Sequence, residues 1–166
     1  MRRPTGETLA RFDLGFLMAQ RLVAQAVYCA AGYFLSGVEE LYERALALLQ
    51  LSANEFGSTG DVIEYHLIVL LRRVLPRMHH RSTWQLLAAT NGDLNRWRRY
   101  LLLLARGGGA QLENQPGIAE LWPSQITAIR AGLISKPGSM AIRMPTSAGK
   151  TRVAEMAIVD HLIAYD

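Results

Sequence analysis

Apolar residues between positions 5 and 106 recur at the spacing of amphipathic helices, and capping signals separate the runs. In the first run, from about 6 to 34, Leu9, Phe16 and other apolar residues share one face, whereas Arg21 lies on the solvent side. Similar runs follow as far as Arg106. The pattern predicts a bundle of about five helices, without strands, in this part of the chain.

Capping and turn signals place the other four helices of this bundle. A serine or threonine with a glutamate or glutamine three residues later caps a helix start, because the two side chains accept from unpaired backbone N–H groups. Glycine, asparagine and proline mark turns and ends. The signals predict a second helix from the box Ser36–Glu39 to about Leu51, followed by a loop over 54–60. Ser58 and Asp61 begin a third helix, which Pro76 kinks or ends. The box Ser82–Gln85 begins a short fourth helix, and a fifth runs from the turn at 91–93 to Arg106.

Three consecutive glycines at 107–109 begin a polar stretch that contains a proline. Glycine is costly inside a helix, so we predict a linker over 107–117 between a helical accessory domain, 1–106, and a second region, 118–166. In the second region the pattern predicts a short helix over 123–134, a turn, a strand over 139–144, a loop, and a helix from Lys150 onward. That order is typical of the start of an α/β domain.

The segment Met144-Pro145-Thr146-Ser147-Ala148-Gly149-Lys150-Thr151 lies between the predicted strand and the predicted helix, as a phosphate-binding loop does. Backbone N–H groups of such a loop bind phosphate oxygens, and the helix dipole adds positive charge. Gly149 permits a close backbone approach, Lys150 supplies a cation to the β- and γ-phosphates, and the Thr151 hydroxyl ligates Mg²⁺. We therefore predict an ATP and Mg²⁺ site from 145 to 151, with Lys150 and Thr151 as its catalytic residues. Met144 stands where the general pattern has its first glycine.

Two stretches resemble motifs of one enzyme family. Residues 142–158 resemble motif I of the Ski-like DExH-box helicases of superfamily two, in which Pro-Thr-x-x-Gly-Lys-Thr replaces the glycine-rich start. Residues 121–125, Leu-Trp-Pro-Ser-Gln, resemble the Q motif of the same family. The resemblance implies that Gln125 binds adenine, and a side-chain amide has the donor and acceptor to match adenine N6 and N7. It covers 118–166 and implies the first RecA-like lobe of a DNA or RNA helicase.

The predicted fold class is therefore mainly α: an N-terminal helical bundle followed by the truncated start of a RecA-like α/β helicase lobe, with helix, strand, P-loop and helix. Motors of this kind also use an acidic Walker B residue on another strand and an arginine from a second lobe. We expect neither within these 166 residues. The full-length parent is expected to be an ATP-dependent helicase, and this chain alone is expected to show no turnover.

Basic residues concentrate in the third to fifth predicted helices, where Asp93 is the only acidic residue from 66 to 106. Such a band can follow a nucleic-acid backbone, and Trp84, Trp97 and Tyr100 can stack on bases. Scattered arginines on solvated helix faces and tryptophans in a core are the commoner explanation. The candidate nucleic-acid residues are Arg72, Arg73, Arg77, Arg81, Arg96, Arg98 and Arg99.

Composition narrows the location and the partners. The formal net charge of +4 and a pI near 9.6 permit a polyanion partner without requiring one. Cys29 is the only cysteine, so no internal disulfide forms, and a cytoplasmic location is predicted. Residues 22–38 carry no charge but include several polar residues and glycines, which favours a buried helix over a membrane span.

Two functional hypotheses remain open at the level of sequence. In the first, the chain is the N-terminal part of a helicase and supplies adenine and phosphate contacts for ATP. In the second, it is a helical protein-interaction module whose P-loop segment is vestigial, so that its partner is a protein bound by residues 1–106.

Overall fold

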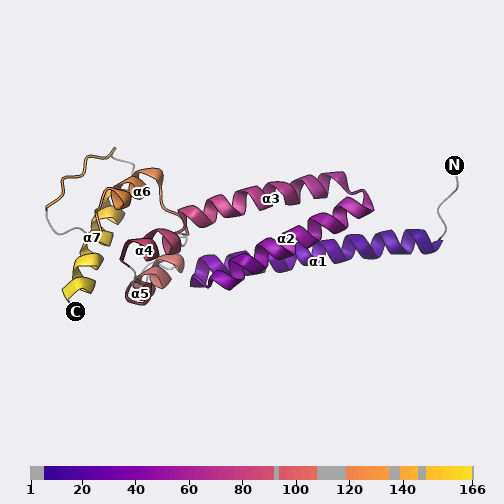
Figure 1. Ribbon diagram of the computed structural model, residues 1–166, viewed down its shortest axis with the longest axis horizontal. Coiled ribbons are helices and arrows are strands. Elements are labelled where there is room, and N and C mark those ends of the chain that lie inside the picture. Colours follow the sequence, from indigo (N-terminus) through magenta and orange to yellow (C-terminus); the bar gives the residue numbers. More distant parts are fainter. Residues whose placement is uncertain (1–5, 92–93, 108–118, 135–138, 146–148, 166) are drawn as a thin grey trace. The chain divides into compact units, whose positions relative to one another are not determined.

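The computed structural model describes residues 6–91, 94–107, 119–134, 139–145 and 149–165, and all regular elements among them are helices (Figure 1). The mainly α class is therefore confirmed, as are five helices before residue 107 without paired strands among the described positions. The helices are α1 (Gly6–Ser36), α2 (Glu39–Thr59), α3 (Val62–Arg81), α4 (Thr83–Asn91), α5 (Leu94–Ala105), α6 (Pro123–Arg130) and α7 (Lys150–Tyr165).

The chain divides into two compact units, one of residues 1–33 and 37–77 and one of residues 34–36 and 78–166. Helices α4 and α5 thus fall in one unit with α6 and α7. The predicted linker at 107–117 and the domain division that rests on it stay predictions, because residues 108–118 lie outside the described part of the chain.

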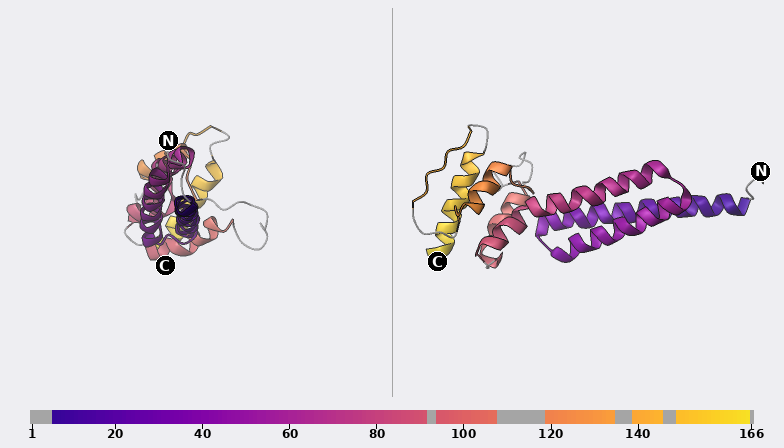
Figure 2. Two further views of the ribbon diagram at one scale, coloured as in Figure 1. Left: turned by 90° about the vertical axis from the view of Figure 1, so that its right-hand side faces the viewer. Right: turned by 45° about the horizontal axis from the view of Figure 1, so that its top comes forward.

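The first unit consists of two antiparallel helical hairpins, α1 with α2 and α2 with α3 (Figure 2). Phe16 and Phe56 meet edge to face with their ring centroids 5.7 Å apart. Nearby, the buried Ser52 hydroxyl donates to the carbonyl oxygen of Ala19 at 3.1 Å. Ala19 itself is fully buried, so a small residue allows the two backbones to approach closely.

Several helix limits in this unit differ from the prediction. The loop expected over 54–60 is helical as far as Thr59, because Ala53 and Phe56 continue the buried face of α2. The helix ends at Gly60, whose φ of 82° is left-handed and suits glycine. Its start is also shifted, since Val38 rather than Ser36 is the N-cap. Pro76 lies inside α3 and does not end it.

Helix α1 is less buried than its uncharged sequence predicted. Ala26 and Tyr33 are buried, but Leu14, Val27 and Tyr28 are more than half exposed. The 23 residues Leu14–Ser36 have a hydropathy of 1.3 and are long and apolar enough to cross a membrane, a test that core helices of soluble proteins also pass. The expectation of no membrane partner stays a prediction.

The second unit packs around two aromatic residues of α4 and α5, Trp84 and Trp97, which are 3% and 0% exposed. Helix α7 contributes Val153 and Met156 to this core. The predicted cap at Ser82 is confirmed on one side, since its hydroxyl accepts from the backbone N–H of Gln85 at 3.2 Å. The other buried members of the core are Leu86, Leu87, Leu101, Leu104, Leu121, Ile126, Ala128, Ile129 and Ile134.

The strand predicted over 139–144 is wrong as a strand, since residues 139–145 form no regular element. A strand needs a neighbour to satisfy its backbone N–H and C=O groups, and a parallel sheet needs several. No other strand exists among the described residues to pair with this segment. Met140 and Ile142 accordingly remain 44% and 39% exposed, whereas helix α7 buries its apolar face on the other helices of the unit.

Candidate nucleotide site

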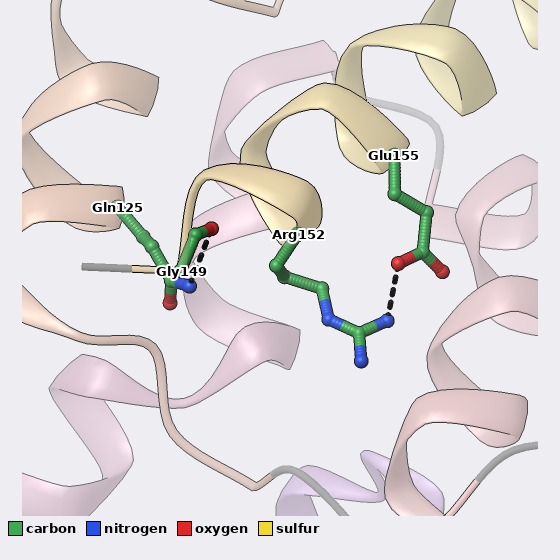
Figure 3. Close-up of polar contacts among 4 residues, drawn as sticks. All are labelled: Gln125, Gly149, Arg152 and Glu155. Carbon is green, nitrogen blue, oxygen red and sulfur yellow. Dashed lines mark hydrogen bonds and ion pairs between the residues drawn. The ribbon is translucent and has the colours of Figure 1, made fainter. Parts of the chain in front are cut away.

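The side chain of Gln125 reaches the backbone of Gly149, so the two predicted motifs meet (Figure 3). Gln125 is the third residue of α6 and is 6% exposed. Its Oε1 accepts from the backbone N–H of Trp122 at 2.9 Å, and its Nε2 donates to the carbonyl oxygen of Gly149 at 3.4 Å. An amide has two N–H groups and two acceptor lone pairs. These two bonds leave one N–H group and one acceptor position of the amide unused.

Gly149 directly precedes helix α7 and has a conformation that favours glycine. Its φ is +72°, and a Cβ at this position would lie 2.3 Å from Gln125 Nε2. Its carbonyl oxygen accepts from the N–H groups of Arg152 and Val153 at 3.1 and 3.3 Å. The first N–H groups of a helix have no acceptor within the helix and carry its positive dipole end. The start of α7, at Lys150 and Thr151, therefore offers donors to an anion.

A pocket of about 510 Å³ lies between the start of α6 and the start of α7. This volume falls in the usual range for small-molecule sites, about 300–1,000 Å³. Both predicted motifs contribute to its wall, through Gln125 on one side and Gly149 and Thr151 on the other. The other lining residues are Ala119, Glu120, Trp122, Arg152 and Glu155.

Two charged residues of α7, Arg152 and Glu155, line the pocket, and Tyr100 of α5 interacts with both. Arg152 Nη1 lies 2.5 Å from Glu155 Oε2, one turn along α7 (Figure 3). Burial raises the pKa of Tyr100 to about 12, with Arg152 opposing that rise and Glu155 adding to it. Tyr100 is therefore protonated at neutral pH. Its buried hydroxyl has no partner in hydrogen-bonding geometry among the described atoms.

The remaining residues of the predicted loop are only partly described. Pro145 is exposed, and Met144 packs against the core of the unit. Lys150 is exposed at the first position of α7, and Thr151 is exposed beside it. The predictions for Thr146, Ser147 and Ala148 fall outside the described residues. The roles assigned to all these residues stay predictions.

The candidate nucleic-acid residues lie in both units. Arg72, Arg73 and Arg77 belong to the first unit, on α3, where the last two are exposed. Arg81, Arg98 and Arg99 are exposed in the second, and the side chain of Arg96 lies outside the described set.

The aromatic residues proposed to stack on bases do not have the exposure that stacking needs. Trp84 and Trp97 are buried in the core of the second unit, and Tyr100 packs against it. Base stacking uses an accessible ring face. The two tryptophans therefore fill the core, which was the commoner explanation for them.

Sequence reasoning did not assign roles to Glu120, Trp122, Arg152 or Glu155, although all four line the pocket. Trp122 is 57% exposed, unlike the other two tryptophans. Its signal in the sequence was its position directly before the Pro-Ser-Gln of the predicted Q motif. The pairing of Arg152 with Glu155 was visible as opposite charges three residues apart on a helix.

Comparison with known proteins finds local similarity to helicases. The chain is similar to ATP-dependent DNA helicase Hel308 of Methanocaldococcus jannaschii, with 45% identity over 47 residues, which are 28% of this chain and 4% of the helicase. For Methanococcus vannielii Hel308 the identity is 42% over 52 residues, 31% of this chain and 7% of the helicase. For Pyrococcus horikoshii Hel308 the identity is 43% over 47 residues, which are 28% of this chain and 6% of the helicase. No family model and no solved structure matches.

These matches are local, since the chain spans only 4 to 7% of the length of the three helicases. Hel308 is a superfamily two helicase, so the local similarity supports the predicted resemblance to superfamily two. It does not test the resemblance to the Ski-like DExH-box group within that superfamily. The local similarity to helicases therefore covers about 28 to 31% of the chain.

Proposed function

We propose that this chain supplies the first nucleotide-binding elements of an ATP-dependent DNA helicase. Gln125 binds the adenine base, and the loop of residues 145–151 binds the phosphates and Mg²⁺. The contact between Gln125 Nε2 and the Gly149 carbonyl oxygen carries this proposal, because it joins two motifs 24 residues apart at one pocket. The relatives support DNA rather than RNA as the nucleic acid, since all three are named as DNA helicases.

The start of α7 is suited to the phosphate end of ATP. Lys150 is exposed there, and the unpaired N–H groups of the first turn add to its positive charge. The Thr151 hydroxyl would hold the Mg²⁺ that accompanies ATP, and the ion would neutralise negative charge on the phosphates. Hydrolysis by such motors also uses an acidic residue and an arginine from other motifs. Binding, rather than turnover, is therefore the activity expected of this chain.

Binding of Mg²⁺-ATP to the chain is expected to change its tryptophan fluorescence through Trp122. This indole is 57% exposed and lines the pocket, whereas Trp84 and Trp97 are buried. A purine that enters the pocket changes the solvent exposure of the Trp122 ring. Titration of the chain with Mg²⁺-ATP should give a saturable fluorescence change, and calorimetry should give the same dissociation constant.

A Trp122→Phe variant is the control, since it keeps an aromatic ring and removes the fluorophore. It should lose the fluorescence change and still show a calorimetric binding signal. Absence of both signals in the unsubstituted chain at about 1 mM ATP, a binding free energy weaker than about −4 kcal/mol, would contradict the proposed nucleotide site.

We also propose that exposed arginines of the second unit contact DNA phosphates. Arg81, Arg98 and Arg99 are exposed there, and each phosphate contact releases counterions. The Arg81→Glu, Arg98→Glu, Arg99→Glu triple variant should bind a single-stranded oligonucleotide at least about 10-fold more weakly at about 50 mM salt. Fluorescence anisotropy over a salt series measures both the affinity and its salt dependence.

Reversal of Arg21, Arg44 and Arg130, which are exposed on α1, α2 and α6, is the matched control. Both triple variants change the net charge equally, so only a localised DNA site predicts a difference between them. Equal weakening by the two variants would reduce the interaction to net charge.

The competing hypothesis is a helical protein-interaction module with a vestigial loop. One observation favours it: Ile63, Leu67, Leu70 and Val74 follow α3 at spacings of four, three and four residues, and are between 44% and 80% exposed. That module has no use for ATP, so the fluorescence and calorimetric titrations separate the two hypotheses.

A further inference from the structure

The charged side chains that line the pocket suit a base better than phosphates on the wall away from Gly149 and Thr151. Three charged side chains line it: Glu120, Arg152 and Glu155. Arg152 is already paired with Glu155. Glu120 forms no ion pair with any described residue, so the described side chains of the wall carry net negative charge. A triphosphate is repelled by such a wall, whereas a group that donates hydrogen bonds is attracted.

Hydrogen bonds of the residues before and after Glu120 fix the backbone at this position. Residues Ser82 and Glu120 form an antiparallel bridge. Thr83 donates its N–H to the carbonyl oxygen of Ala119, and Leu121 donates its own to that of Arg81, both at 3.1 Å. The junction of α3 and α4 thus fixes the pocket wall, which prepares a side chain on it for recognition.

Alternation along this extended segment aims Glu120 at the pocket. Successive side chains of extended backbone point to opposite sides. Leu121 is 2% exposed and belongs to the core of the unit, while Glu120 and Trp122 on either side of it line the pocket. The carboxylate therefore faces the same space as the indole of Trp122 and the amide of Gln125.

The carboxylate and the amide together match one edge of adenine. The 6-amino group of adenine has two N–H donors, and N7 beside it is an acceptor. The open acceptor position of Gln125 can take one N–H, its open donor can reach N7, and the second N–H is left for a carboxylate. Guanine instead presents an acceptor oxygen at the 6 position, which a carboxylate repels.

We propose that Glu120 is a specificity-determining residue that accepts a hydrogen bond from the 6-amino group of the base, so that the site selects 6-aminopurine over 6-oxopurine nucleotides. This inference rests on the proposed nucleotide-binding function. The junction between α3 and α4 then contributes to base selection, because its hydrogen bonds position the backbone of Glu120.

Calorimetric titration of the whole chain with the Mg²⁺ complexes of ATP, GTP and 2′-deoxy-ATP tests the proposal. The unsubstituted chain should bind ATP at least about 10-fold more tightly than GTP. Glu120→Gln should reduce this preference to less than about 3-fold, because an amide can donate to the guanine oxygen as well as accept. Glu155→Gln removes the same charge from the pocket, and it should change the ATP and GTP affinities in parallel.

The possible failures are distinguishable. A Glu120→Gln variant that keeps the full preference for ATP over GTP overturns the assignment of Glu120 and leaves the nucleotide site intact. A variant that keeps that preference but alters the ratio of ATP to 2′-deoxy-ATP affinity also overturns it, since Glu120 then contacts the ribose. If the unsubstituted chain binds none of the three nucleotides, the proposed function itself fails. Circular dichroism confirms that each variant keeps its helical content.

Discussion

Replacing Gly149 with alanine is expected to weaken binding of Mg²⁺-ATP by about 10- to 100-fold. The substitution affects both the stability of the fold and the binding site. The residue has a φ of +72°, a conformation that costs a non-glycine residue about 1–2 kcal/mol. The new Cβ would also lie 2.3 Å from Gln125 Nε2, so the amide must leave the position that joins the two motifs. Calorimetry with Mg²⁺-ATP measures the loss, and thermal unfolding measures the cost to the fold.

Gly60→Ala provides the matched control for the strain alone. Gly60 has a φ of +82°, but a Cβ there meets no atom within 4 Å. Both variants therefore place an alanine in the left-handed conformation, which lowers stability, and only Gly149→Ala displaces a side chain. Gly60→Ala should lower stability by about 1–2 kcal/mol and leave ATP affinity unchanged. If Gly149→Ala binds ATP as tightly as Gly60→Ala does, the contact between Gln125 and Gly149 has no role in binding.

The helices were predictable because they depend on local signals. Apolar periodicity placed all five helices before residue 107, and the cap at Ser82 forms the expected bond to the backbone of Gln85. The ends were less predictable. Polar residues over 54–60 suggested a loop, but burial of Ala53 and Phe56 outweighs that local preference and extends α2 to Thr59.

The strand over 139–144 could not be judged from its own residues. An apolar run indicates a strand only where neighbours complete its hydrogen bonds, and no described residue of this chain does so. Helix α7 differs, because a helix satisfies its own backbone and needs only a surface on which to pack. Met156, which is fully buried, finds that surface in the core that contains Trp97.

Part of the candidate site followed from sequence, and part depended on tertiary structure. Gln125 and Gly149 belong to motifs whose spacing allowed both to reach one nucleotide, and the two residues are in contact. Glu120 and Trp122 line the pocket because Leu121 between them is buried, and burial at one position cannot be read from a short polar and apolar stretch. The backbone bridge from Glu120 to Ser82 joins segments 38 residues apart, and a local sequence pattern cannot predict such a contact.

Removing the Lys150 ammonium is expected to weaken Mg²⁺-ATP binding by about 10- to 100-fold, since hydrogen bonds to charged groups contribute about 1.5–3 kcal/mol. Lys150 is exposed at the first position of α7 and is not among the residues that line the pocket. Its side chain can therefore bind phosphates outside the negatively charged pocket. Affinity for adenosine, which lacks phosphates, should change little in Lys150→Ala.

The chain has only one other lysine, Lys136, so Lys136→Ala removes the same charge and the same side chain elsewhere in the sequence. Calorimetry should show unchanged ATP affinity in this control. In a longer protein that hydrolyses ATP, Lys150→Ala should abolish turnover, because the cation also stabilises charge on the transferred phosphoryl group, while DNA binding largely survives. Equal ATP affinities for Lys150→Ala and Lys136→Ala would show that residues 145–151 do not bind phosphate, even if the pocket at Gln125 binds adenosine.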